Sequence, residues 1–162
     1  MPAFDVVVRA ATPADAGLIL EFIRELAEYE RLVHEVVATE AAIRSTLFGD
    51  APAAEVLMCE HRGEPAGFAL HFPTYSTFLG RSGIHLEDLF VRPAHRGAGC
   101  GRMLLSALAR VAIERGAGRL EWAVLDWNTS AIGFYRSIGA ASMDGWTTNR
   151  LTGAALESLA AQ

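Results

Sequence analysis

Apolar residues recur along this chain at two spacings, one typical of helices and the other of strands. Between residues 18 and 26 they recur at intervals of three and four, which predicts a helix with one apolar face. The residues of this face are Leu18, Ile19, Phe22, Ile23 and Leu26. The preceding Thr12-Pro13-Ala14-Asp15 offers a capping threonine, a proline suited to the first helical position and an early aspartate. The helix should therefore start there and end near Tyr29-Glu30.

Glycine and proline divide the rest of the chain into further strands and helices. Strands are predicted over 4–9, 55–62, 65–75, 83–92, 119–125 and 146–151. Helices are predicted over 39–48, from Met103 to about Gly116, over 128–137 and over 153–160. Because helices and strands alternate, the predicted fold class is α/β or α+β with a mixed sheet. The length of 162 residues, without repeat or linker, predicts one domain, 1–162.

Charge and composition narrow the range of functions. The chain has 19 acidic and 14 basic residues, a net charge of −5, which argues against nucleic-acid binding and is compatible with a cationic substrate or with solubility alone. The two cysteines have no metal-binding or redox spacing and the five histidines form no HExxH motif, so we expect no metal and a cytoplasmic location. The start lacks a signal-peptide pattern, and no uncharged apolar run approaches the roughly 20 residues of a membrane span.

Segment 89–102 joins a strand to a helix through a glycine-rich loop. Its glycines let the backbone approach a ligand closely, and the N–H groups at the start of a helix favour an anion. Arg96 and Arg102 can add charge-assisted hydrogen bonds, which indicates a phosphate or pyrophosphate site. Arg102-Met103 does not supply the Lys-Ser/Thr of a P-loop, and Leu104 stands where a dinucleotide fingerprint needs its third glycine. From the residues alone, a loop that only turns tightly before a helix fits equally well.

Two segments carry a resemblance to a known family. Arg96-Gly97-Ala98-Gly99-Cys100-Gly101 resembles the Arg/Gln-x-x-Gly-x-Gly/Ala signature of GNAT N-acetyltransferases, which holds the acetyl-CoA pyrophosphate. Asn128-Thr129-Ser130-Ala131-Ile132-Gly133-Phe134-Tyr135, followed by Gly139-Ala140, resembles the family's second conserved segment. The resemblance covers nearly the whole chain. It implies the GNAT fold, a mostly antiparallel mixed sheet with splayed strands flanked by helices.

Within the family, the chain is similar to the diamine (spermidine/spermine) and thialysine acetyltransferase group. The segments that carry this similarity are 25–30, 75–80, 86–91 and the pair Gly145-Trp146. Segments 75–77 and 123–128 are nearer to the thialysine branch. The polyamine branch tends to have an acid where this chain has Ser76, so the resemblance implies a weaker preference for long polyamines.

The resemblance assigns roles to individual residues. It implies that Glu87 is the general base, acting through water, and that Tyr135 is the general acid. The implied substrate-binding residues are Glu30, Glu87, Asp88 and Trp146. The implied cofactor-binding residues are Leu89, Phe90, Val91, Arg96, Gly97, Ala98, Gly99, Cys100, Gly101, Arg102, Asn128, Phe134 and Tyr135.

Several of these residues also have simpler interpretations. Phe134 fits helix packing better than a ligand contact, and Asn128 can serve as a helix cap. Alternation along the strand places Glu87 on one face and Asp88 on the other, although a bulge would disturb this arrangement. His85 is interpreted as a structural or surface residue.

The sequence therefore predicts an acetyl-CoA-dependent N-acetyltransferase that acts on the primary amine of a small cationic molecule. One alternative is an acetyltransferase for protein N-termini or lysines. A non-catalytic CoA-binding regulatory module is another. The resemblance also implies a homodimer to which the C-terminal region contributes.

Overall fold

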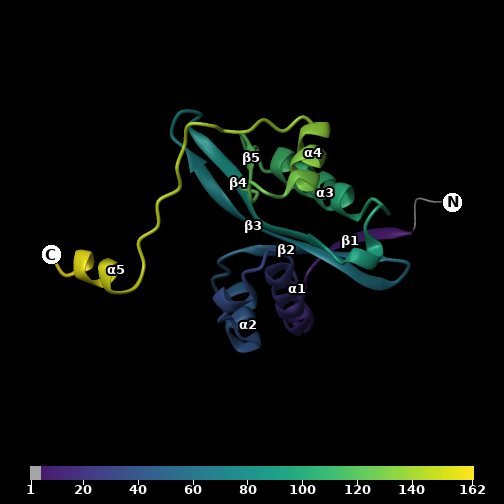
Figure 1. The fold of residues 1–162 in the computed structure, drawn as a ribbon, viewed down its shortest axis with the longest axis horizontal. Coiled ribbons are helices and arrows are strands. Elements are labelled where there is room, and N and C mark those ends of the chain that lie inside the picture. The colour runs from purple at the N-terminus through teal and green to yellow at the C-terminus, as the bar shows by residue number, and fades with distance from the viewer. Residues whose placement is uncertain (1–4) are drawn as a thin grey trace. The chain divides into compact units, whose positions relative to one another are not determined.

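The computed structural model describes residues 5–162, which form a mixed α/β fold on one five-stranded sheet (Figure 1). The strands are β1 (Val6–Ala10), β2 (Glu55–His61), β3 (Glu64–Ser76), β4 (Arg81–Val91) and β5 (Leu120–Glu121). The helices are α1 (Ala16–Tyr29), α2 (Glu40–Phe48), α3 (Cys100–Glu114), α4 (Thr129–Ser137) and α5 (Gly153–Ala160). Short 3₁₀ turns cover Pro13–Asp15, Val33–Glu35 and Pro93–His95.

The strands follow one another across the sheet in chain order, β1-β2-β3-β4-β5. The first four are antiparallel to their neighbours, and β5 runs parallel to β4. The predicted fold class, a mixed and mostly antiparallel sheet flanked by helices, is thus confirmed.

Both faces of the sheet are covered by helices, with α1 and α2 on one side and α3 on the other (Figure 1). On the α1 side, the ring of Phe22 stacks on Phe68 of β3 at 5.5 Å between centroids and lies 6.3 Å from the ring of Phe90 of β4. On the other side, Leu104 and Leu108 of α3 are completely buried. Close packing of this kind tolerates little movement, so β4 is fixed from both faces.

By its internal contacts the chain divides into a larger unit that ends at Ala123 and a smaller unit, Val124–Gln162. The larger unit contains the whole sheet with α1, α2 and α3, and the smaller unit contains α4 and α5. The interpretation of the chain as one domain stays a prediction.

Two predicted strands differ from the structure. Residues 119–125 form only the two-residue β5, because its ladder with β4 has only two rungs. Residues 146–151 form neither helix nor strand, since no strand of the described chain pairs with them and a strand needs a partner for its backbone N–H and C=O groups. Phe4, at the start of the first predicted strand, lies outside the described residues.

The start of the first helix is held by an ion pair with β1. Arg9 donates two hydrogen bonds to the carboxylate of Asp15, at 2.8 and 2.9 Å, and the backbone N–H of Thr12 donates to the same group at 2.7 Å. The hydrogen bonds from Arg9, together with the one from Thr12, lower the pKa of Asp15 to about 2. A carboxylate bound in this way stabilises the fold only while it is ionised.

Replacement of Asp15 by asparagine should therefore lower the free energy of unfolding at pH 7 by about 2 kcal/mol, because Arg9 loses one of its two charged partners and keeps only Glu60, at 3.1 Å. Since the pKa of Asp15 is depressed, this contribution is complete above pH 4 and is lost as the pH falls through about 2. Thermal unfolding of the wild type and Asp15→Asn from pH 7 to pH 2 measures the difference. The exposed Asp50 supplies the control, Asp50→Asn. An equal loss of stability in both variants would contradict the assigned role of Asp15. So would a stability difference between the wild type and Asp15→Asn that stays the same as the pH falls to 2.

Candidate active site

The glycine-rich loop between β4 and α3 presents free backbone N–H groups at the start of a 15-residue helix. Gly97 and Gly99 have positive φ angles of 80° and 91°, and a Cβ atom at either position would meet nothing within 4 Å. No backbone carbonyl of residues 5–162 accepts from the N–H groups of Gly97, Ala98, Gly99, Cys100 or Gly101. An open cradle of N–H groups at the positive end of a helix suits a phosphate or pyrophosphate.

Arg96 is held against the end of β4 and against α1. Its Nε donates to the carbonyl of Val91 at 2.9 Å, and its guanidinium lies 4.8 Å from the ring centroid of Tyr29 and 5.9 Å from that of Phe90. The loop and the last turn of α1 are therefore linked through one side chain. Arg102, the other predicted basic residue of the loop, is exposed on the first turn of α3.

A second arginine, Arg92, fixes the exit of β4. It donates to Glu25 at 2.7 Å and to Glu21 at 2.8 Å, and its guanidinium lies 4.7 Å above the ring of Phe22. All three partners belong to α1. Sequence analysis missed this residue, although two acids four positions apart on one helix face could have indicated a basic partner.

Beyond its first few residues, β4 has a free edge on the β5 side. The ladder between β4 and β5 pairs only Ile84 with Leu120 and His85 with Glu121. β4 continues over 86–91, and within residues 5–123 no strand pairs with this stretch on that side. The predicted cofactor residues Leu89, Phe90 and Val91 lie here, where backbone groups are available to an extended ligand.

A β-bulge lies in the middle of β4. Leu70 of β3 pairs with Asp88 and His71 with Leu86, so Glu87 is the extra residue without a partner. The bulge keeps Asp88 on the face of the sheet that packs against α1, and the 3.3 Å contact between His85 Nε2 and Glu87 Oε2 places Glu87 on the same face. The alternation that placed Glu87 opposite Asp88 is therefore wrong.

Three predicted substrate-binding acids are electrostatically coupled. Burial, together with the charges of Glu87 and Glu30, raises the pKa of Asp88 to about 6. Burial also raises the pKa of Glu30, which follows the last residue of α1. The structure thus brings Glu30, Glu87 and Asp88 together, next to the free edge of β4. Two carboxylates with raised pKa values, Asp88 and Glu30, beside a third carboxylate can bind a cation and accept a proton.

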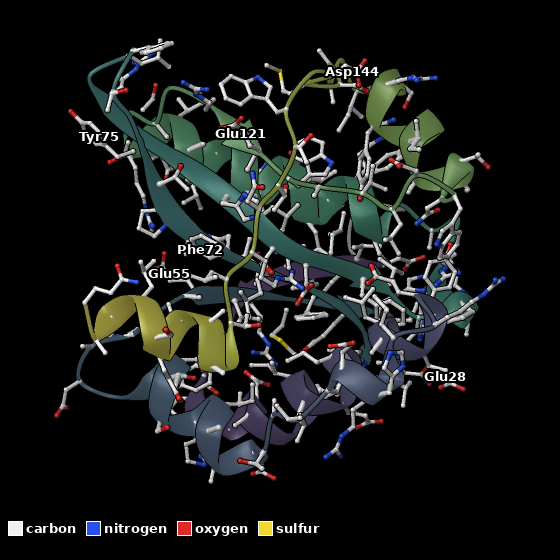
Figure 2. The ribbon with its side chains drawn as sticks, turned by 60° about the vertical axis from the view of Figure 1, so that its left-hand side comes forward. Glu28, Glu55, Phe72, Tyr75, Glu121 and Asp144 are labelled. Atoms are coloured by element: carbon white, nitrogen blue, oxygen red, sulfur yellow. The ribbon has the colours of Figure 1, made fainter. Side chains whose placement is uncertain are left out.

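Ser76 lies far from this acidic group. It ends β3 and pairs with Arg81, seven residues along β4 from Asp88, a span of about 23 Å. Figure 2 shows the adjacent Tyr75 and Glu28, on the last turn of α1, on opposite sides of the molecule. The Ser76 hydroxyl is engaged by Arg119 and by the N–H of Leu79. Within one chain, an acid at this position would therefore lie far from Asp88 and could not contact the same ammonium group.

The remaining predicted residues belong to the smaller unit. Asn128 caps α4, because its side chain accepts from the N–H of Ala131 at 3.3 Å. Phe134 and Tyr135 lie on α4 with ring centroids 5.7 Å apart. Trp146 lies in the irregular segment between α4 and α5. Their roles in cofactor binding and catalysis stay predictions.

Comparison with known proteins shows the family. Residues 20–140 match the model of the acetyltransferase (GNAT) family. The chain belongs to that family. It is 40% identical to thialysine N-epsilon-acetyltransferase of Bos taurus over 166 residues, covering 96% of this chain and 97% of the relative. It is 35% identical over 197 residues to an L-ornithine N5-acetyltransferase of Arabidopsis thaliana, covering 94% of this chain and 86% of the relative.

The same fold is found in a solved structure. An integron cassette protein from V. cholerae superposes with a TM-score of 0.81 at 24% sequence identity, covering 98% of this chain and 99% of that one. The GNAT protein is therefore an N-acetyltransferase with the fold predicted from its sequence. Among residues 5–162, no helix is long and apolar enough to cross a membrane. In the same part of the chain, His, Cys, Asp and Glu residues form no group of three or more that could hold a metal ion.

Proposed function

We propose that this GNAT protein transfers the acetyl group of acetyl-CoA to the primary amine of a small molecule with more than one positive centre. The observation that carries the proposal is the group of Glu30, Glu87 and Asp88 beside the free edge of β4. The two relatives support a compact acceptor, since their names give thialysine and ornithine, short amino acids with a terminal amine. A thialysine-like amino acid or a short diamine fits this description.

The acceptor must lose a proton before it can react. An alkyl ammonium has a pKa near ~10.4, so about one molecule in a few thousand is nucleophilic at pH 7. Asp88 and Glu30 would hold the cation, and Glu87 would take the proton from nitrogen through a bridging water. A backbone N–H near Val91 would stabilise the oxyanion that forms as nitrogen attacks the thioester. Tyr135 would return a proton to the CoA thiolate as the C–S bond breaks.

A turnover assay tests this proposal. Acetyl-CoA would be supplied with thialysine, lysine, ornithine, short diamines, spermidine, spermine and a lysine-containing peptide, and kcat/KM measured for each. We expect the compact amines to have the highest kcat/KM. A clear advantage for the peptide would favour a protein acetyltransferase, and an advantage for spermine would overturn the compact acceptor. Binding of acetyl-CoA without turnover of any amine would favour a non-catalytic CoA-binding module.

Acetyl-CoA itself should raise the midpoint of thermal unfolding, because a ligand that binds only the folded state stabilises it. Arg96→Glu places a negative charge where the loop would hold the pyrophosphate and removes the link to Val91. We expect the variant to bind acetyl-CoA about tenfold or more weakly, as expected for the loss of one charge-assisted contact and the gain of a repulsive one. Arg110→Glu, on the exposed side of α3, is the charge-matched control. Stabilisation by NAD or ATP but not by CoA would contradict the assigned cofactor.

A further inference from the structure

His85 lies directly beside the carboxylate assigned as the general base. Its Nε2 is 3.3 Å from Oε2 of Glu87, and the two side chains are 30% and 55% exposed. They are two residues apart on β4 and share the face that packs against α1. Glu87 is the extra residue of the bulge and has no cross-strand partner. Among the described residues, His85 Nε2 is the one basic nitrogen found within 4.0 Å of its carboxylate.

The ring of His85 is itself held in place. It packs against Phe72, its cross-strand neighbour on β3, with ring centroids 5.1 Å apart. Phe72 packs against the core formed with α1 and α2, and Figure 2 shows it on the sheet. The His85 backbone also forms the last rung with β5 before the free edge begins. The imidazole is therefore anchored on a rigid part of the sheet, while Glu87 projects from a bulge.

A second acid faces the same histidine but has another partner. Glu121 pairs with His85 across the parallel ladder, and paired residues of neighbouring strands share a face. Arg119 Nε lies 3.7 Å from Oε1 of Glu121 and offsets its charge. This arrangement leaves the His85 Nε2–H available to Glu87.

We propose that His85 is a positioning residue for acetyl transfer, whose Nε2–H donates to Oε2 of Glu87 and holds that carboxylate toward the free edge of β4. This inference rests on the proposed function, because it needs Glu87 to act as the base. His85 takes no direct part in the proton transfer. The ammonium N–H bond breaks, its proton passes through water to the other carboxylate oxygen of Glu87, and the nitrogen lone pair attacks the thioester carbon. As the C–S bond breaks, the nitrogen loses its second proton and the CoA thiolate gains one, which leaves the amide and free CoA thiol. An exposed glutamate without this hydrogen bond occupies several rotamers, of which only some are productive.

Two substitutions separate the hydrogen bond from ring packing. His85→Phe keeps a ring against Phe72 and removes the donor, and His85→Gln keeps an amide N–H donor and removes the ring. We expect His85→Phe to lower kcat about tenfold with the KM for acetyl-CoA unchanged, because geometry at the reacting atoms affects kcat and not cofactor binding. His85→Gln should retain kcat within about threefold of the wild type.

Measuring kcat for His85→Phe in a Glu87→Gln background shows whether His85 acts through Glu87. If His85 acts through Glu87, adding His85→Phe to Glu87→Gln should lower kcat by less than about twofold further. An unchanged kcat in His85→Phe, an equal loss in His85→Gln, or fully multiplicative losses in the double variant would each overturn the role of His85. In those cases the wild type still acetylates amines and the proposed function stands. A wild type that acetylates none of the amines overturns both.

Discussion

Tyr135→Phe should lower kcat by roughly 100-fold or more, the size typical of losing a positioned general acid. The leaving CoA thiol has a pKa of about 8.5, so its thiolate gains from a proton donated as the C–S bond breaks. Phenylalanine keeps the ring beside Phe134 and removes only the hydroxyl. Folding and the thermal stabilisation by acetyl-CoA should therefore survive. Steady-state kinetics with a saturating amine measure the loss.

Tyr75 offers a matched control for this substitution. It lies near the end of β3 and is 68% exposed (Figure 2). Tyr75→Phe removes the same hydroxyl from a surface site and should leave kcat unchanged. If Tyr135→Phe also leaves kcat unchanged, Tyr135 is a packing residue of α4 and the proposed general acid must be sought elsewhere.

Local signals in the sequence predicted most of the elements. Thr12-Pro13 and Asn128 mark helix starts because each supplies chemistry that a helix N-terminus needs. Asn128 caps α4 as expected, whereas Thr12 caps the 3₁₀ turn Pro13–Asp15 and α1 itself begins at Ala16. The acids Glu30, Glu87 and Asp88 were grouped only through the family resemblance, since nothing local relates position 30 to position 88. Their electrostatic coupling in the structure agrees with that grouping.

The face on which Glu87 lies could not be predicted from β4 alone. A bulge is a property of two strands, and this one exists because Leu70 pairs with Asp88 while His71 pairs with Leu86. The contact between His85 and Glu87 depends on the same local geometry. Alternation, which takes one strand in isolation, assigned Glu87 to the wrong face.

The sequence alone could not show how far Ser76 lies from the acids assigned to substrate binding. Its position in the sequence gives no distance to Asp88, whereas the ladder of β3 and β4 pairs Ser76 with Arg81, seven positions before Asp88 on β4. The prediction of a strand over 146–151 was wrong for a related reason, since apolar and β-branched residues favour a strand but do not supply a pairing partner. In both cases the missing information was which segments lie next to each other.

Asp88→Asn should stabilise the protein at neutral pH while it weakens substrate binding. The pKa of Asp88 is raised from 3.8 to about 6, so between these values the folded state keeps a proton that the unfolded state releases. Stability therefore falls as the pH rises through this window. Asparagine has no charge to bury, and its free energy of unfolding at pH 7.5 should exceed that of the wild type by up to about 3 kcal/mol. Near pH 4 the difference should disappear.

The same substitution should reduce kcat/KM for a short diamine roughly 30-fold, because removing one member of a partly buried charge pair costs about 2 kcal/mol or more. A monoamine of similar length with a neutral tail should lose much less, since it lacks the second positive centre. The ratio of the two kcat/KM values cancels titrations common to both substrates. In the wild type this ratio should fall as the pH drops through about 6 and Asp88 becomes protonated, and in Asp88→Asn it should be low and independent of pH. If the ratio keeps the same pH dependence in Asp88→Asn, then Asp88 does not set that pH dependence. The second ammonium would in that case be bound by Glu30 or Glu87.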